Sequence, residues 1–99
     1  MENQHMTAES FEGYRTRFLA AGADEVIERR WSPGQIVETH THPFDADAVL
    51  AEGEMWLTCS GETRHLHVGD TFHIPALTPH DERYGPGGAV YWVARRNLR

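Results

Sequence analysis

The stretch that decides the fold reads Gly34-Gln-Ile-Val-Glu-Thr-His40-Thr-His42-Pro-Phe-Asp-Ala-Asp-Ala-Val-Leu-Ala-Glu-Gly53. Two histidines one residue apart lie on a predicted strand between two glycine turns. Residues i and i+2 of an extended backbone point to the same face, so we expect His40 and His42 to lie side by side. Imidazole is the commonest protein ligand of divalent transition metals, and two imidazoles on one strand face can chelate a single ion.

The composition limits what surrounds this pair. Ninety-nine residues are enough for one domain with a modest core. The single cysteine, Cys59, excludes an internal disulfide framework and suits a reducing compartment. Residues 1–10 lack the basic and then apolar regions of a signal peptide, which favours a cytoplasmic location.

The net charge and the lengths of the apolar runs exclude two classes of partner. The net charge is −6, whereas phosphate binding needs clustered Lys and Arg, so we expect no nucleic-acid partner. No apolar run approaches the length needed to span a bilayer, so we expect no membrane partner. The seven histidines are many for this length, and they point to site chemistry instead.

The apolar pattern changes its period along the chain. We predict disorder for residues 1–6 and a helix over residues 7–22, because Phe11, Tyr14 and Phe18 recur at three- and four-residue spacing. Thr7 is the expected cap of that helix, and Gly22 suits the position just past its end.

From residue 25 to residue 95 the pattern is typical of short strands separated by Gly and Pro turns. The predicted strands are 26–31, 36–42, 48–51, 54–59, 63–68, 71–74, 80–84 and 89–94. Turn signals every eight to twelve residues indicate an antiparallel sandwich or a small barrel. The sequence therefore predicts a single all-β domain over residues 1–99 with one N-terminal helix.

A second stretch in which Gly, Pro and His recur at fixed spacing follows downstream and reads Gly69-Asp-Thr-Phe-His-Ile-Pro75-Ala-Leu-Thr-Pro-His80. Gly69 permits a tight turn, Pro75 ends a strand, and His80 begins the next one. Taken together, the two stretches resemble the paired motifs of the cupin family. In the first motif Gly34, His40, His42 and Gly53 match, and in the second Gly69, Pro75 and His80 match.

The resemblance implies a double-stranded β-helix (jelly-roll) barrel. It also implies one divalent transition metal held by His40, His42 and His80. Histidine-rich sites accept Fe, Mn, Ni, Cu or Zn, so the identity of the metal stays open.

The fourth ligand of the family motif is a glutamate, and this chain departs from the motif there. With three residues after His42 the position falls on Ala46 and Gly53 is in register. With four residues it falls on Asp47, which supplies a carboxylate but requires a one-residue slip. A bulge could aim either Asp45 or Asp47 inward, so Asp47 is the candidate fourth ligand and Asp45 is its alternative.

Two further positions depart from the second motif, since Leu77 replaces its loop glycine and Tyr84 replaces its asparagine. Tyr84 offers a phenol to a ligand or serves as a core aromatic. Glu38 shares a strand face with His40 and His42 by parity, so it either lines the pocket or lies on an exposed rim. Tyr84 and Glu38 are the candidate catalytic residues, and Asp45 and Asp47 are further acid/base groups.

The other histidines are predicted to lie on the surface. His65 and His67 repeat the His-x-His spacing on a strand whose apolar residues alternate with them. His73 lies between Phe72 and Ile74, and it points away from the core if they point in.

Two functions follow from the resemblance. The first is a metal-dependent enzyme acting on a small molecule, of the dioxygenase, isomerase or decarboxylase type. The second is a non-catalytic module that binds a small ligand or a metal, as sensor domains do, and a purely structural barrel is a third alternative. We also expect a homodimer, because small barrels gain by covering exposed strand edges and because Trp31, Trp56 and Trp92 exceed the needs of a small core.

Overall fold

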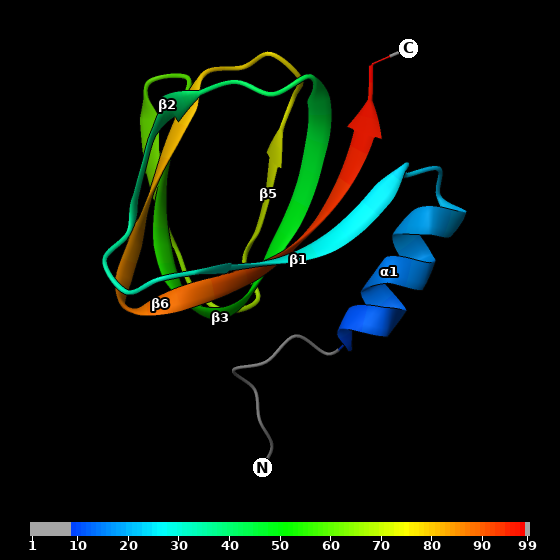
Figure 1. The fold of residues 1–99 in the computed structure, drawn as a ribbon, viewed down its shortest axis with the longest axis horizontal. Coiled ribbons are helices and arrows are strands. Elements are labelled where there is room, and N and C mark those ends of the chain that lie inside the picture. The colour runs from blue at the N-terminus through cyan, green and yellow to red at the C-terminus, as the bar shows by residue number, and fades with distance from the viewer. Residues whose placement is uncertain (1–8, 99) are drawn as a thin grey trace.

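The computed structural model describes residues 9–98, which form one helix followed by six strands (Figure 1). The elements are α1 (Phe11–Ala20), β1 (Glu25–Trp31), β2 (Ile36–His40), β3 (Phe44–Cys59), β4 (Glu62–Leu66), β5 (Thr71–Ile74) and β6 (His80–Asn97). The prediction of disorder over residues 1–6 falls outside the described residues. Within 9–98, no helix is long and apolar enough to cross a membrane.

Helix α1 is shorter than predicted, because it begins after Ser10. The Ser10 side chain accepts a hydrogen bond from the Gly13 N–H at 3.1 Å and so satisfies one of the free N–H groups of the first turn. The predicted cap, Thr7, lies outside the described residues.

Two long strands, β3 and β6, organise the barrel, and each contributes to both of its sheets. The first part of β3 pairs with the last part of β6, and this pair is flanked by β5 and β1. The last part of β3 pairs with the first part of β6, and this pair is flanked by β4 and β2. All pairings are antiparallel, and the result is the jelly-roll barrel that the sequence predicts.

The strands predicted over 48–51 and 54–59 are one element, and so are those over 80–84 and 89–94. Gly53 and Gly88 are bends within β3 and β6 instead of turns between strands, with φ of +80° and +76°. The β3–β6 register shifts on both sides of Glu52, between Leu50 and Met55. Glycine in a strand often marks such a bulge or a close approach of two backbones.

Two apolar clusters lie on opposite faces of the first sheet, which is formed by β1, β5, the first part of β3 and the last part of β6. The inner cluster fills the barrel and includes Leu50, Met55, Leu66 and Tyr84. The outer cluster lies under α1, where Tyr14 packs beside Trp92 with ring centroids 5.7 Å apart. Figure 1 shows α1 outside the barrel, next to β1.

The three tryptophans do not form one surface. Trp92 is buried under α1, and Trp31 is half-buried with its ring stacked on Tyr84 at 5.0 Å. Trp56 is half-buried and lies between the ring of His65 and the guanidinium of Arg83. The homodimer stays a prediction.

Candidate metal centre

Three histidines meet at one mouth of the barrel. His40 ends β2, His42 follows it, and His80 begins β6 directly opposite His40 in the strand register. The ring centroid of His80 lies 4.3 Å from that of His40 and 4.8 Å from that of His42. The structure therefore places His80 close to both His40 and His42, which are up to 40 residues away in the sequence and whose own ring centroids are 6.1 Å apart.

The same hydrogen bond orients all three rings. The Nδ1 atoms of His40, His42 and His80 lie 2.9, 3.0 and 2.9 Å from the backbone carbonyl oxygens of Glu38, Phe44 and Thr78. A carbonyl oxygen only accepts, so each Nδ1 carries the proton and each Nε2 keeps its lone pair. Metal-ligating histidines are held in this way, with the other ring nitrogen donating to a carbonyl or carboxylate.

The surroundings favour the neutral form of His42 and leave a buried nitrogen of His80 without a partner. Burial lowers the pKa of His42, and the neighbouring His80, His40 and Arg95 lower it further. His80 is 2% exposed, and its Nε2 has no hydrogen-bond partner among the described residues. A buried lone pair without a partner is costly unless a ligand satisfies it.

Glu82 supplies the carboxylate that the first motif lacks. It lies two residues after His80 on β6, it is 4% exposed, and its Oε2 is 3.7 Å from His80 Nε2. One ligand atom from each of His40, His80 and Glu82 lies within 4.8 Å of the others. Sequence reasoning missed Glu82, although an i+2 position on a strand that begins with His80 is the signal that could have found it.

Tyr84 is a core residue that touches the site through Glu82. It is 2% exposed, its ring stacks on Trp31, and its hydroxyl donates to Glu82 Oε1. Burial raises the pKa of Tyr84, so the phenol stays protonated and remains a donor. Tyr84 does not line the histidine pocket, and its role there is to position Glu82.

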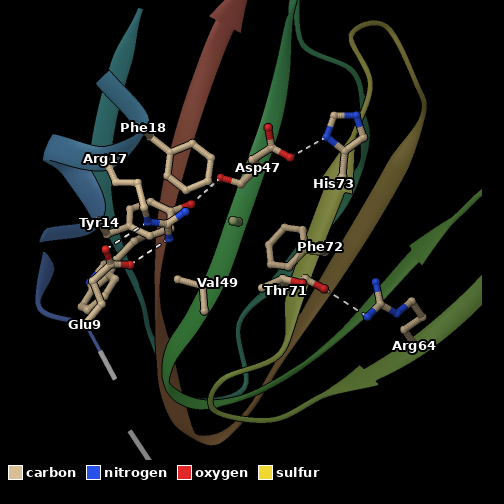
Figure 2. A pocket seen from close by; sticks show the side chains of 12 residues that line it. Glu9, Tyr14, Arg17, Phe18, Asp47, Val49, Arg64, Thr71, Phe72 and His73 are labelled. Carbon is tan, nitrogen blue, oxygen red and sulfur yellow. Dashed lines mark hydrogen bonds and ion pairs between the residues drawn. The ribbon is translucent and has the colours of Figure 1, made fainter. Parts of the chain in front are cut away.

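The structure does not bring either candidate aspartate to the histidines. Ala46 faces the barrel interior, so its neighbours on both sides point out. Asp47 lies on the outer face, where its carboxylate is 2.7 Å from His73 Nδ1 (Figure 2). The same carboxylate is 3.1 Å from Arg96 Nη1. Asp45 accepts a hydrogen bond from the Ala76 N–H at 2.7 Å. Neither Asp47 nor Asp45 therefore lies among the histidines, contrary to the expectation that one of them is the fourth ligand.

Glu38 is also directed away from the histidines. The register of β2 against β6 shifts between Val37 and His40, where two residues of β2 lie opposite one residue of β6. This bulge breaks the parity that placed Glu38 and His40 on one face. Glu38 is exposed and lies on the outer surface with Ile36 and Asp81, so it is a rim residue rather than a catalytic one.

The larger hollow of the molecule lies outside the barrel. It is a groove of about 690 Å³ between α1, β3 and β5, and Figure 2 shows Tyr14 and Phe18 on one side of it and Thr71 and His73 on the other. Its charged groups already have partners, since Arg17 pairs with Glu9, Asp47 with His73, and Arg64 donates to the Thr71 carbonyl. The histidine pocket is only about 90 Å³, but it contains the polar atoms that still lack partners.

His65 and His67 lie on the surface, as predicted, and form a second cluster with Glu54. One ligand atom from each of these three lies within 4.8 Å of the others, and His65 Nε2 is 2.7 Å from Glu54 Oε2. Both histidines are exposed. This surface cluster can hold a cation by itself, so it has to be controlled for in any measurement of bound metal.

Leu77 retains the backbone conformation of the glycine it replaces. Its φ is +64°, its side chain is 60% exposed, and its N–H donates to the His42 carbonyl at 2.8 Å. We expect Leu77→Gly to raise the free energy of unfolding by about 0.5 kcal/mol, because relief of left-handed strain slightly exceeds the added entropy of the unfolded chain. Thermal unfolding checks this, with Leu77→Ala as the control that keeps the strain. A melting temperature lower in the glycine variant than in the alanine variant would contradict it.

Comparisons with known proteins agree with this geometry. The family profile described as "Cupin domain" matches residues 28–93, which is two thirds of the chain. The chain is a cupin. Among solved structures, this cupin is similar to KdgF from Halomonas sp., with a TM-score of 0.67 and 21% identity over 75% of this chain and 68% of that one.

Two further solved structures resemble this cupin. An RmlC-like cupin from Shewanella frigidimarina has a TM-score of 0.64 and 23% identity over 76% of this chain and 68% of that one. DMSP lyase structures, described for RdDddP and RnDddQII, give a TM-score of 0.69 and 22% identity, and the match covers 74% of this chain but only 38% of that one. A comparison with curated proteins found no match.

Proposed function

We propose that this cupin is a metal-dependent enzyme acting on a small molecule, with a divalent transition metal bound by His40, His42, His80 and Glu82. The observation that carries the proposal is the common orientation of the three imidazoles. Each Nδ1–H donates a hydrogen bond to a backbone carbonyl, so the Nε2 lone pair of each neutral ring can bind a metal at the mouth of the barrel.

The buried carboxylate supports the same conclusion. Glu82 is 4% exposed, and no Lys or Arg of the described residues forms an ion pair with it. A buried charge without a counter-ion is strongly unfavourable. Three neutral imidazoles and one carboxylate form a ligand set that suits Fe, Mn, Ni, Cu or Zn, and a bound cation would neutralise Glu82.

The side chains around the ligands suit chemistry on an enclosed group. Phe44, Phe72 and Ile74 line the pocket and exclude water from it. Tyr91 also lines the pocket, and burial raises the pKa of its hydroxyl, so it stays a neutral proton donor. A metal bound here would polarise a substrate oxygen or activate a bound water or O₂, which fits dioxygenase, isomerase or decarboxylase chemistry.

Elemental analysis of the untagged protein tests the metal site. We expect the wild type to retain a divalent metal stoichiometrically, and His40→Ala and His80→Ala to lose it. Circular dichroism of each variant shows whether the barrel is still folded. Undiminished metal in either folded variant would contradict the proposal.

The surface cluster of Glu54, His65 and His67 requires a matched control. All measurements are therefore repeated in a His65→Ala/His67→Ala background, which removes that cluster and leaves the pocket unchanged. Metal that disappears with this double variant alone belongs to the surface. A metal-loaded protein that turns over no member of a small-molecule panel would favour the non-catalytic binding module.

A further inference from the structure

Two arginines line the histidine pocket from the wall that faces the histidines. Arg29 lies on β1 and Arg95 on β6, and both belong to the first sheet. Arg29 pairs in register with Tyr91, and Arg95 pairs with Ala46, and both partners line the same pocket. A cavity that holds three metal-type ligands therefore also has two fixed positive charges.

The unsatisfied polar atoms of the protein gather at this pocket. Among the described residues, the buried side-chain nitrogens and oxygens without a hydrogen-bond partner are Trp31 Nε1, His80 Nε2 and Arg95 Nε. All three side chains line the one cavity. Trp31 Nε1 and Arg95 Nε can only donate, so the group that they lack is an acceptor. Buried donors without acceptors are rare and each requires an explanation.

Arg95 is held in place while its Nε stays free. Its Nη1 is 3.2 Å from Glu25 Oε1, and its guanidinium carbon is 4.5 Å from the ring centroid of Phe44. Phe44 in turn stacks on His42 at 4.1 Å. This arrangement connects the arginine to a histidine of the metal centre and removes much of its side-chain freedom before any ligand binds.

The charges of the pocket balance only while no metal is bound. Arg29 and Arg95 contribute two positive charges, which are offset by Glu82 in the cavity and by Glu25, the ion-pair partner of Arg95. Arg29 forms no ion pair with a described residue and contacts the ring of Trp31, 4.7 Å from its centroid. A divalent metal bound here would add two positive charges, so the electrostatics would then favour an anionic ligand.

Ala46 explains where that anion fits. With three residues after His42, the glutamate position of the cupin motif falls on Ala46, which faces Arg95 across the β3–β6 ladder. Alanine in place of glutamate removes a negative charge and four heavy atoms from the wall beside the guanidinium. The space left by the smaller side chain therefore lies beside the arginine whose Nε–H lacks an acceptor.

We infer that the pocket binds a small molecule through a carboxylate, which Arg95 holds beside Ala46 in the place of the motif glutamate, with Arg29 as the second cation. The cavity of about 90 Å³ is roughly three times the volume share of a water molecule, about 30 Å³. It encloses a carboxylate and one or two carbons, and a larger ligand extends outward through the mouth. The inference rests on the proposed function only in that it concerns the same pocket, and it does not require a bound metal.

Nuclear magnetic resonance of the Arg95 Nε–H group tests this inference, with acetate and acetamide as probes of equal shape and different charge. The metal is first removed with a chelator, so that acetate cannot bind through it. We expect acetate to shift the Arg95 Nε–H resonance and to bind at least about tenfold more tightly than acetamide, which is about 1.4 kcal/mol. Arg95→Gln should abolish this preference, and Arg30→Gln, an exposed arginine on the outer face of β1, should retain it.

A second variant places the carboxylate in the protein itself. Ala46→Glu is expected to fill the space beside Arg95, so acetate no longer shifts the Nε–H resonance. Equal binding of acetate and acetamide by the wild type, or unchanged acetate binding in Arg95→Gln, would overturn the inference. Metal content separates this from failure of the proposed function, because Arg95→Gln should bind metal as the wild type does.

Discussion

Replacing Gly53 with alanine is expected to lower the free energy of unfolding by about 3–5 kcal/mol. Two effects add at this position. The φ of Gly53 is +80°, which strains any residue with a Cβ, and that Cβ would overlap the carbonyl oxygen of Gly88 and lie 2.9 Å from Ala89 Cα. Neither neighbour is a flexible side chain, so the two long strands would have to separate where they bend.

The matched control is Gly61→Ala, in the turn between β3 and β4. Gly61 has nearly the same φ, +79°, but a Cβ there would meet nothing within 4 Å. We expect this variant to lose only the strain energy of about 1–2 kcal/mol. Chemical denaturation of the two variants measures the difference, and equal losses would show that the close approach of β3 and β6 does not constrain the barrel.

The same corner explains which part of the fold could be predicted from sequence. Alternating apolar residues between Gly and Pro located most of the extended segments but divided each of the two long strands in two, because period-2 patterning reflects only which face is buried. Gly53 and the run from Gly85 to Gly88 were interpreted as turns, because a glycine with positive φ suits a turn and a bend equally well. Only the pairing of β3 with β6 along both halves distinguishes the two, and that pairing is a long-range property.

In the candidate site, too, local sequence patterns predicted some features and missed those that depend on strand register. The spacing of His40, His42 and His80 within two Gly- and Pro-containing stretches was enough to predict that these side chains meet. Of the two alternatives for Glu38, the exposed rim is the one observed, because a bulge between Val37 and His40 reverses strand parity and leaves no mark in the local pattern. Glu82 was missed because the cupin motif places the fourth ligand after His42, although a strand beginning at His80 was expected and Glu82 lies two residues further along it.

Glu82 is the residue for which metal binding and protein stability should respond in opposite directions. In the metal-loaded protein, Glu82→Gln removes a charged ligand and should weaken metal affinity on the order of 100-fold. In the metal-free protein the same variant replaces a buried charge by a neutral group of equal shape. The Tyr84 hydroxyl can still donate to the amide oxygen, so stability should be unchanged or higher.

Thermal unfolding with and without metal measures both effects at once. At a metal concentration about 100 times the wild-type dissociation constant, bound metal should stabilise the wild type by about 2.7 kcal/mol and Glu82→Gln by only about 0.4 kcal/mol. Tyr84→Phe leaves the carboxylate in place but removes the hydrogen bond that orients it, so a loss of about tenfold in affinity is expected. Glu54→Gln, which removes the carboxylate of the surface cluster, should leave the affinity of the pocket unchanged.

The opposite signs are what distinguish a ligand from a structural residue. A purely structural Glu82 would destabilise the protein to the same extent with and without metal when it is replaced, because its contacts would not depend on the ion. Equal metal stabilisation of the wild type and Glu82→Gln would leave His40, His42 and His80 as the whole protein ligand set. One ligand position would then be left to an oxygen atom of a substrate, in a cavity that Arg29 and Arg95 also line.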